Sequence, residues 1–108
     1  MSATNRQTLF TILFGPIEGN IHSSDEELVK NLEKEEHLVK IEKHCWVLKT
    51  KECAAFIRRV ENRIANGVGN SFIAIETCGP VRMGVPREIN DKLEKMGLEV
   101  WNVHQIPN

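Results

Sequence analysis

The chain has 108 residues, a length that suits one compact domain. Hydrophobic residues make up 41% and charged residues 27% of it, with 14 Lys and Arg against 15 Asp and Glu. This ordinary globular composition excludes disorder over most of the length, and the formal net charge of −1 excludes a general basic footprint for nucleic acid. We expect a single domain over residues 1–108, with residues 1–7 as a flexible N-terminus.

The cysteines and the apolar runs indicate the compartment. Cys45, Cys53 and Cys78 are odd in number, and their spacing fits neither a zinc ribbon nor a redox pair. Free thiols are typical of a reducing compartment. No apolar run approaches the ~20 residues that a membrane span needs, and residues 1–7 lack a signal-peptide pattern. The sequence therefore predicts a soluble, cytoplasmic protein that makes no membrane contact.

The first half of the chain predicts a strand, a helix and two short strands. Residues 8–14 (TLFTILF) are β-branched and aromatic, which favours a buried strand, and Gly15 and Pro16 end it. Residues 24–27 (SDEE) form a capping-box pattern in which the Ser24 hydroxyl caps the start of an acidic helix. Beyond that helix the alternation is loose, and we expect strands over Val39–Cys45 and Trp46–Lys49.

The second half begins with the clearest helix of the chain. Thr50 is placed to cap it, Asn66 and Gly67 end it, and its apolar stripe consists of Cys53, Phe56, Ile57, Val60 and Ile64. Residues 71–76 (SFIAIE) predict a fourth strand. A loop over residues 78–84 leads to a third helix that begins at Pro86 and ends at Gly97, and a short last strand follows.

This element order predicts an α+β fold. Strand, helix, two strands, helix and strand correspond to a ferredoxin-like β-α-β-β-α-β sandwich, to which the C-terminal helix and short strand are added. Its four-stranded antiparallel sheet would carry two helices on one face. The other face would meet a partner or a second subunit, because apolar side chains there would otherwise stay exposed to water.

Residues 40–50 (KIEKHCWVLKT), the arginine-bearing helix after them and residues 71–76 resemble a known group of proteins. These are the small ferredoxin-like proteins related to the CRISPR-associated spacer-acquisition subunit, including SinR-like proteins and virulence-associated protein D toxins. The resemblance covers about residues 8–76 and implies the fold, a dimer and a contact with nucleic acid. Nuclease members carry a metal-binding aspartate at the end of the first strand, whereas this strand ends Leu13-Phe14-Gly15. Nuclease activity is therefore not carried over.

Cationic and aromatic side chains are the candidate binding residues. Arg58, Arg59 and Arg63 lie on the polar side of the second helix, either as a solvated face or, with Lys43, as a phosphate-contacting patch. Trp46 and Trp101 are interpreted as core or interface anchors, and the interface is the role we assign them. Stacking on bases is the alternative role for both tryptophans.

No catalytic or metal-binding pattern is specific. The histidines His22, His37, His44 and His104 lack the short spacing of a zinc site with the cysteines. The loop over residues 15–20 lacks the lysine and glycine spacing of a phosphate-binding loop. Cys78 could act as a nucleophile only if His104 approached it as a base. We therefore expect no catalytic residue, no metal and no cofactor.

Three functions remain open from the sequence. The first is a non-enzymatic, homodimeric interaction module, which fits the missing catalytic groups and the two tryptophans. The second is a nucleic-acid-binding, nuclease-like protein without the usual aspartate, which rests on the arginine face and the resemblance. The third is a small enzyme that uses Cys78 or a histidine, and it satisfies least of what an active site requires.

Overall fold

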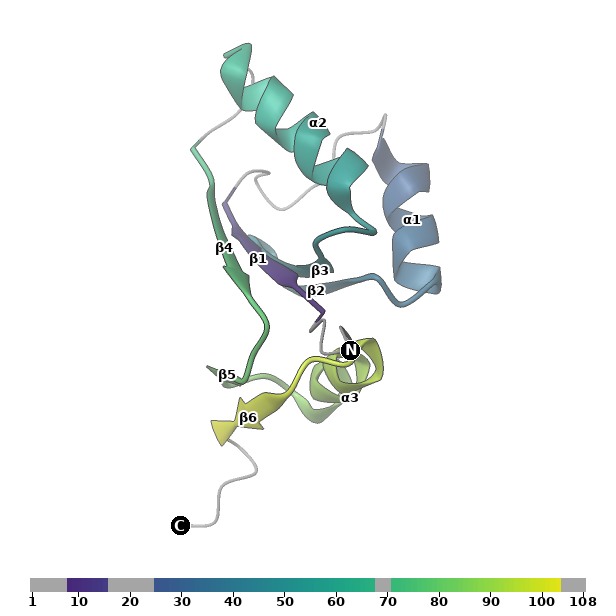
Figure 1. Ribbon diagram of the computed structural model, residues 1–108, viewed down its shortest axis with the longest axis vertical. Helices are drawn as coiled ribbons and strands as arrows, with labels where there is room; N and C mark the ends of the chain where they lie inside the picture. The colour runs from purple at the N-terminus through teal and green to yellow at the C-terminus, as the bar shows by residue number, and fades with distance from the viewer. Residues whose placement is uncertain (1–7, 16–24, 68–70, 104–108) are drawn as a thin grey trace, which may run out of the picture.

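The computed structural model describes residues 8–15, 25–67 and 71–103, and within them six strands and three helices form a small α+β domain (Figure 1). The predicted α+β class is confirmed at this level. The expected N-terminal segment, the Ser24 cap and most of the loop before it lie outside the described residues. In chain order the elements are β1 Phe10–Phe14, α1 Glu26–Lys34, β2 Leu38–Glu42, β3 Cys45–Lys49, α2 Ala54–Ala65, β4 Ile73–Thr77, β5 Val81–Met83, α3 Arg87–Met96 and β6 Val100–Asn102.

Four of the strands form one antiparallel sheet in the order β2-β3-β1-β4. The central strand β1 pairs with β3 on one side, where Leu13 faces Trp46, and with β4 on the other, where Leu13 faces Ala74. Within the described residues β2 and β4 are therefore the two edges of the sheet. The chain reaches these edges through α1 and α2, which precede β2 and β4 respectively.

The first face of the sheet is covered by α1 and α2. Successive side chains of a strand point to opposite faces, so Leu13, Trp46 and Leu48 share this face. The predicted stripe of α2 is buried against them at Cys53, Phe56 and Val60, while Ile57 and Ile64 are half-buried. Burial of this size stabilises the fold by about 1.5–3 kcal/mol for each large apolar side chain. The buried members of this core are Leu13, Val29, Leu32, Leu38, Trp46, Leu48, Cys53, Phe56 and Val60.

The opposite face is only partly covered, by α3. Its core consists of Phe10, Val39, Val47, Val85, Leu93, Met96 and Leu98. Since α3 packs against β2, the far edge of this face at β4 is left open. Ile73 is 61% exposed and Ile75 is 50% exposed. The strand expected over residues 71–76 is present as β4, but it leaves Ile73 and Ile75 exposed, and from this segment Phe72 packs against the first core.

Two local boundaries differ from the sequence prediction. Cys45 begins β3 instead of ending β2, because residues 43 and 44 form the turn between the strands and Glu42 faces Cys45 across it. Thr50 does not cap α2. Its hydroxyl is hydrogen-bonded to that of Thr11 at 2.7 Å, and the chain makes a further turn before α2 begins at Ala54.

The C-terminal part builds a second, smaller sheet. Residues 81–83, expected as loop, form β5, which pairs in parallel with β6. The amide of Val81 donates to the carbonyl of Glu99, and the Asn102 side chain donates to the carbonyl of Val85 at 2.8 Å. The last strand therefore adds to β5 and not to the main sheet, as Figure 1 shows.

Candidate interaction surfaces

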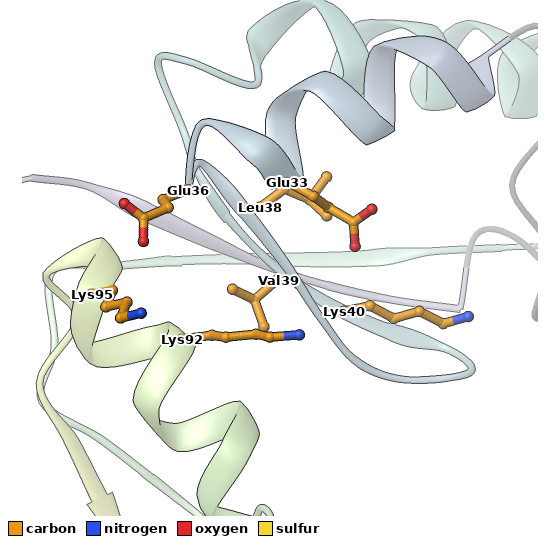
Figure 2. A pocket seen from close by; sticks show the side chains of 7 residues that line it. All are labelled: Glu33, Glu36, Leu38, Val39, Lys40, Lys92 and Lys95. Atoms are coloured by element: carbon orange, nitrogen blue, oxygen red, sulfur yellow. The ribbon is translucent and has the colours of Figure 1, made fainter.

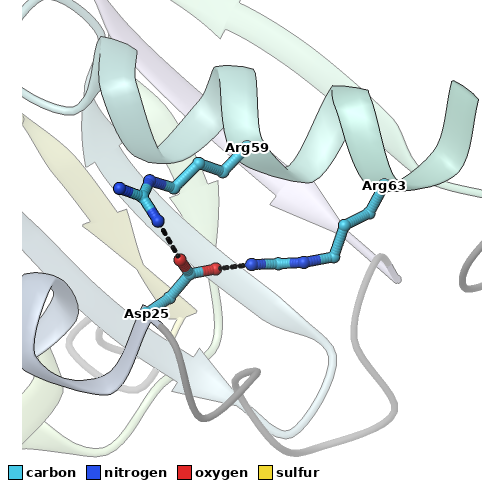
Figure 3. Close-up of polar contacts among 3 residues, drawn as sticks. All are labelled: Asp25, Arg59 and Arg63. Atoms are coloured by element: carbon cyan, nitrogen blue, oxygen red, sulfur yellow. Dashed lines mark hydrogen bonds and ion pairs between the residues drawn. The ribbon is translucent and has the colours of Figure 1, made fainter. Parts of the chain in front are cut away.

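Two of the four predicted phosphate contacts hold a carboxylate of the protein itself. Asp25 immediately precedes α1 and its side chain is fully buried. Arg59 of α2 donates to one of its oxygens at 3.1 Å, and Arg63, one turn further along, donates to the other (Figure 3). Because both carboxylate oxygens of Asp25 accept from arginines of α2, its side chain does not cap α1. These two arginines therefore connect the helices of the first face.

The other two predicted cations are exposed. Arg58 lies on the solvent side of α2, and Lys43 lies in the turn between β2 and β3. The predicted patch of four cations is therefore divided. Arg59 and Arg63 are held in ion pairs with Asp25, whereas Arg58 and Lys43 have no common partner among the described residues. A phosphate would have to compete with Asp25 for Arg59 and Arg63.

The two tryptophans occupy different environments. Trp46 is 0% exposed and lies in the core beneath α1 and α2. Trp46 is therefore a core residue and not the interface residue that we expected, and it offers no surface to a partner. Trp101 on β6 is 46% exposed, lies 5.4 Å from the Arg82 guanidinium and donates to the Glu99 carboxylate at 3.2 Å.

Two of the three cysteines are buried thiols. Burial raises the pKa of Cys45 to about 11, and the nearby Glu42 carboxylate adds to this. Burial likewise raises the pKa of Cys53 to about 12, so both thiols stay protonated at neutral pH. Cys78 is exposed, and its suggested base His104 lies outside the described residues. No group of three or more metal-ligating side chains occurs among the residues described.

An apolar patch borders the β4 edge of the sheet. Phe14 of β1 faces Ile73 of β4 across the ladder, and Ile12 faces Ile75, so all four side chains share the second face. Phe14 is 40% exposed, while Ile73 and Ile75 are more exposed still. We call Phe14, Ile73 and Ile75 the β4 patch. The sequence predicts two hydrophobic strands over residues 8–14 and 71–76 that contain these residues, but their exposure depends on where α3 packs.

A groove of about 300 Å³ borders the opposite edge, at β2. We call it the β2 groove, and its lining consists of Glu33, Glu36, Leu38, Val39, Lys40, Lys92 and Lys95. Figure 2 shows the two carboxylates on the α1 side of β2 and Lys92 and Lys95 on the α3 side. Lys40 of β2 places its ammonium 5.8 Å from the Trp46 ring. Sequence reasoning missed this site because its acidic and basic walls come from distant segments.

No protein family, curated protein or solved structure matches this chain. Its function must therefore be inferred from its own surfaces, and the described residues offer the β4 patch and the β2 groove for this. Among the residues that the structure describes, the helices are too short or too polar for any of them to cross a bilayer.

Proposed function

We propose that this chain is a non-enzymatic interaction module of ferredoxin-like fold, which forms a homodimer by joining the β4 edges of two copies. The order β2-β3-β1-β4 with antiparallel neighbours supports the fold, because two interlocked β-α-β units produce that order. The exposed β4 patch is the observation that carries the dimer. The relation to the CRISPR-associated subunit stays a prediction from the sequence pattern.

The hydrogen-bonding direction of β4 suits pairing with a second copy. The amide of Gly15 donates to the carbonyl of His44, so Gly15 directs its backbone groups toward β3. Because this direction alternates along a strand, Phe10, Ile12 and Phe14 direct their N–H and C=O groups toward β4. Their partners on β4 include Ile75, so the intervening residues Ala74 and Glu76 turn their backbone groups to the open edge.

A twofold, antiparallel pairing centred on Ile75 satisfies these backbone groups. Ala74 of each copy would exchange both hydrogen bonds with Glu76 of the other, and Ile75 would face its own counterpart directly. Ile73 would extend the apolar contact on the same face. No like charges meet in this register, whereas a twofold pairing of β2 edges would bring the α3 lysines of both copies together.

The experiment compares two substitutions of the same kind. Size-exclusion chromatography with light scattering should give the wild type twice the chain mass of 12.3 kDa. Ile75→Glu should give a monomer, because two carboxylates would face each other at the centre of the joint. Val103→Glu is the matched control, since Val103 is also 50% exposed but lies beyond β6, outside the β4 patch. It should remain dimeric.

A monomeric wild type at every concentration tested would overturn the proposed dimer. So would equal behaviour of the two variants, because the effect would then not depend on the β4 edge. Nucleic-acid binding receives less support than the dimer, since Arg59 and Arg63 are engaged by Asp25.

A further inference from the structure

The β2 edge presents backbone groups to its groove. The amide of Lys49 donates to the carbonyl of His37 at 2.8 Å, so this pair is bonded across the β2–β3 ladder. In an antiparallel ladder bonded pairs alternate, and Val39 with Val47 is the next one. Leu38 between them therefore turns its N–H and C=O away from β3. Because Leu38 lines the groove, a strand lying there could hydrogen-bond to it.

The two walls of the groove differ in charge, although Lys40 of β2, which lies on the same face as Trp46, stands with the two carboxylates on the α1 side. On that side stand Glu33, in the last turn of α1, and Glu36, three residues further along and beyond the end of the helix. On the α3 side stand Lys92 and Lys95, with the same spacing. Figure 2 shows β2 running between these walls. The floor is the edge of β2 at Leu38 and Val39, whose buried side chains point to opposite faces of the sheet.

We propose that the β2 groove binds an extended peptide segment of a partner protein in which basic and acidic side chains alternate. Successive side chains of an added strand point to opposite faces of the sheet. Its lysines or arginines would then meet Glu33 and Glu36, while its acidic side chains would meet Lys92 and Lys95. Main-chain hydrogen bonds to β2 give affinity, and the charged walls select the sequence.

The same charges exclude a second copy as the occupant. In a twofold antiparallel pairing of two β2 strands, the sheet face that carries α3 in one copy lies beside the same face of the other copy. Lys92 and Lys95 would therefore lie next to the lysines of the other α3. Like charges in that position disfavour the contact. This inference is independent of the proposed dimer, because the dimer uses β4 at the other edge.

The first measurement titrates the full chain with two capped, dye-labelled peptides of equal composition. TEKEKEKV alternates its charges, whereas TEEEKKKV groups them. Fluorescence anisotropy should show that the alternating peptide binds at least about tenfold more tightly, and that its binding weakens with salt. Light scattering during the titration should show no change in the number of chains per particle.

The second measurement exchanges the charge of one wall. Lys92→Glu with Lys95→Glu makes both walls acidic, so affinity for TEKEKEKV should fall by about tenfold while affinity for TKKKKKKV rises above that of the wild type. The matched control is Lys51→Glu with Arg87→Glu, which changes the net charge equally at exposed positions outside the groove. This control should bind TEKEKEKV about as the wild type does, within about twofold.

A third readout needs no variant and locates the peptide. The Leu38 amide should exchange rapidly in the free protein and slowly when TEKEKEKV is bound. The proposal is overturned if neither peptide binds, if the grouped peptide binds equally well, or if the control variant loses as much affinity as the groove variant. Slow exchange of the Leu38 amide before any peptide is added would also overturn it, because the edge would already be occupied.

Discussion

At the scale of single residues, the buried carboxylate of Asp25 joins the two helices of the first face. Its charge is compensated by Arg59 and Arg63, and it also lies at the start of α1, where the helix dipole favours a negative group. We expect Asp25→Asn to lower the free energy of unfolding by about 2 kcal/mol, because it leaves two guanidiniums facing a neutral amide. Urea denaturation followed by circular dichroism measures this change.

The control for Asp25 is its exposed neighbour Glu26, whose carboxylate also lies at the start of α1. Glu26→Gln should change the free energy of unfolding by less than about 0.5 kcal/mol, as surface substitutions usually do. If the two variants lost the same free energy of unfolding, Asp25 would stabilise the fold through the helix dipole and not through its two arginines.

The buried thiol of Cys53 predicts a loss of stability in alkali. Its side chain donates to the carbonyl of His37 at 3.3 Å, and burial raises its pKa from 9.0 to about 12. The unfolded chain therefore releases this proton near pH 9, while the folded protein keeps it until about pH 12. The stabilisation is complete below pH 9 and is lost as the pH rises through that window.

The test for Cys53 is the slope of stability against pH. Cys53→Ala should reduce the decline in the free energy of unfolding between pH 9 and pH 11, although its absolute stability is lower because the substitution opens a cavity. Cys78→Ala is the control, since Cys78 is exposed and should leave the slope as it is in the wild type. An unchanged slope in Cys53→Ala would contradict the assignment.

At the scale of elements, α1 and α3 end in the same way with different residues. After α1 the amide of His37 donates to Leu32 and that of Glu36 to Glu33, and after α3 the amide of Leu98 donates to Leu93. Both ends need a left-handed residue next to the helix. In α3 this residue is Gly97, with φ 95°, and in α1 it is Glu36, with φ 62°.

Substitutions at these two helix ends should have opposite effects. Glu36→Gly should raise the free energy of unfolding by about 0.5–1 kcal/mol, because glycine adopts this conformation without the steric cost of a Cβ. Gly97→Ala should lower it by about 1 kcal/mol, from backbone strain alone, since a Cβ there would contact nothing within 4 Å. Thermal unfolding of both variants decides this, and the same sign for both would be the contradicting outcome.

The elements were largely predictable because their patterns are local. The α2 stripe with Phe56 and Val60 repeats at helical spacing, and both residues are buried as expected. Trp46 was ambiguous, because β3 is covered on both faces and its neighbours Val47 and Leu48 are fully buried as well. With no alternation to read, the sequence could not separate a core tryptophan from an interface tryptophan.

The candidate surfaces were not predictable because they depend on packing between distant segments. The strand containing Ile73 has the composition of a buried strand, and only the position of α3 beside β2 leaves it exposed. The β2 groove likewise needs α1 and α3 to approach β2 from opposite faces. The arginines of α2 show the opposite situation. From the sequence Arg59 and Arg63 were candidates for contacting phosphate, but in the fold both bind the carboxylate of Asp25.

At the scale of the whole molecule, the β2 and β4 edges of the main sheet carry different kinds of side chain. The β4 edge carries the apolar residues Ile73 and Ile75, whereas the β2 edge lies between acidic and basic walls. Unpaired edges invite association with other strands, and charged groups restrict which strands can add. The apolar patch at the β4 edge therefore suits self-association, and the charged walls at the β2 edge suit a sequence of complementary charge.

Placing β2 and β4 on opposite sides of the sheet means that filling one leaves the other accessible. Two chains joined at β4 would carry their peptide sites at the far ends of a single, continuous sheet. A target with two suitable segments, spaced to reach both ends, would be retained by avidity, because it escapes only when both attachments open together. Breaking the joint would leave each individual attachment intact and abolish this retention.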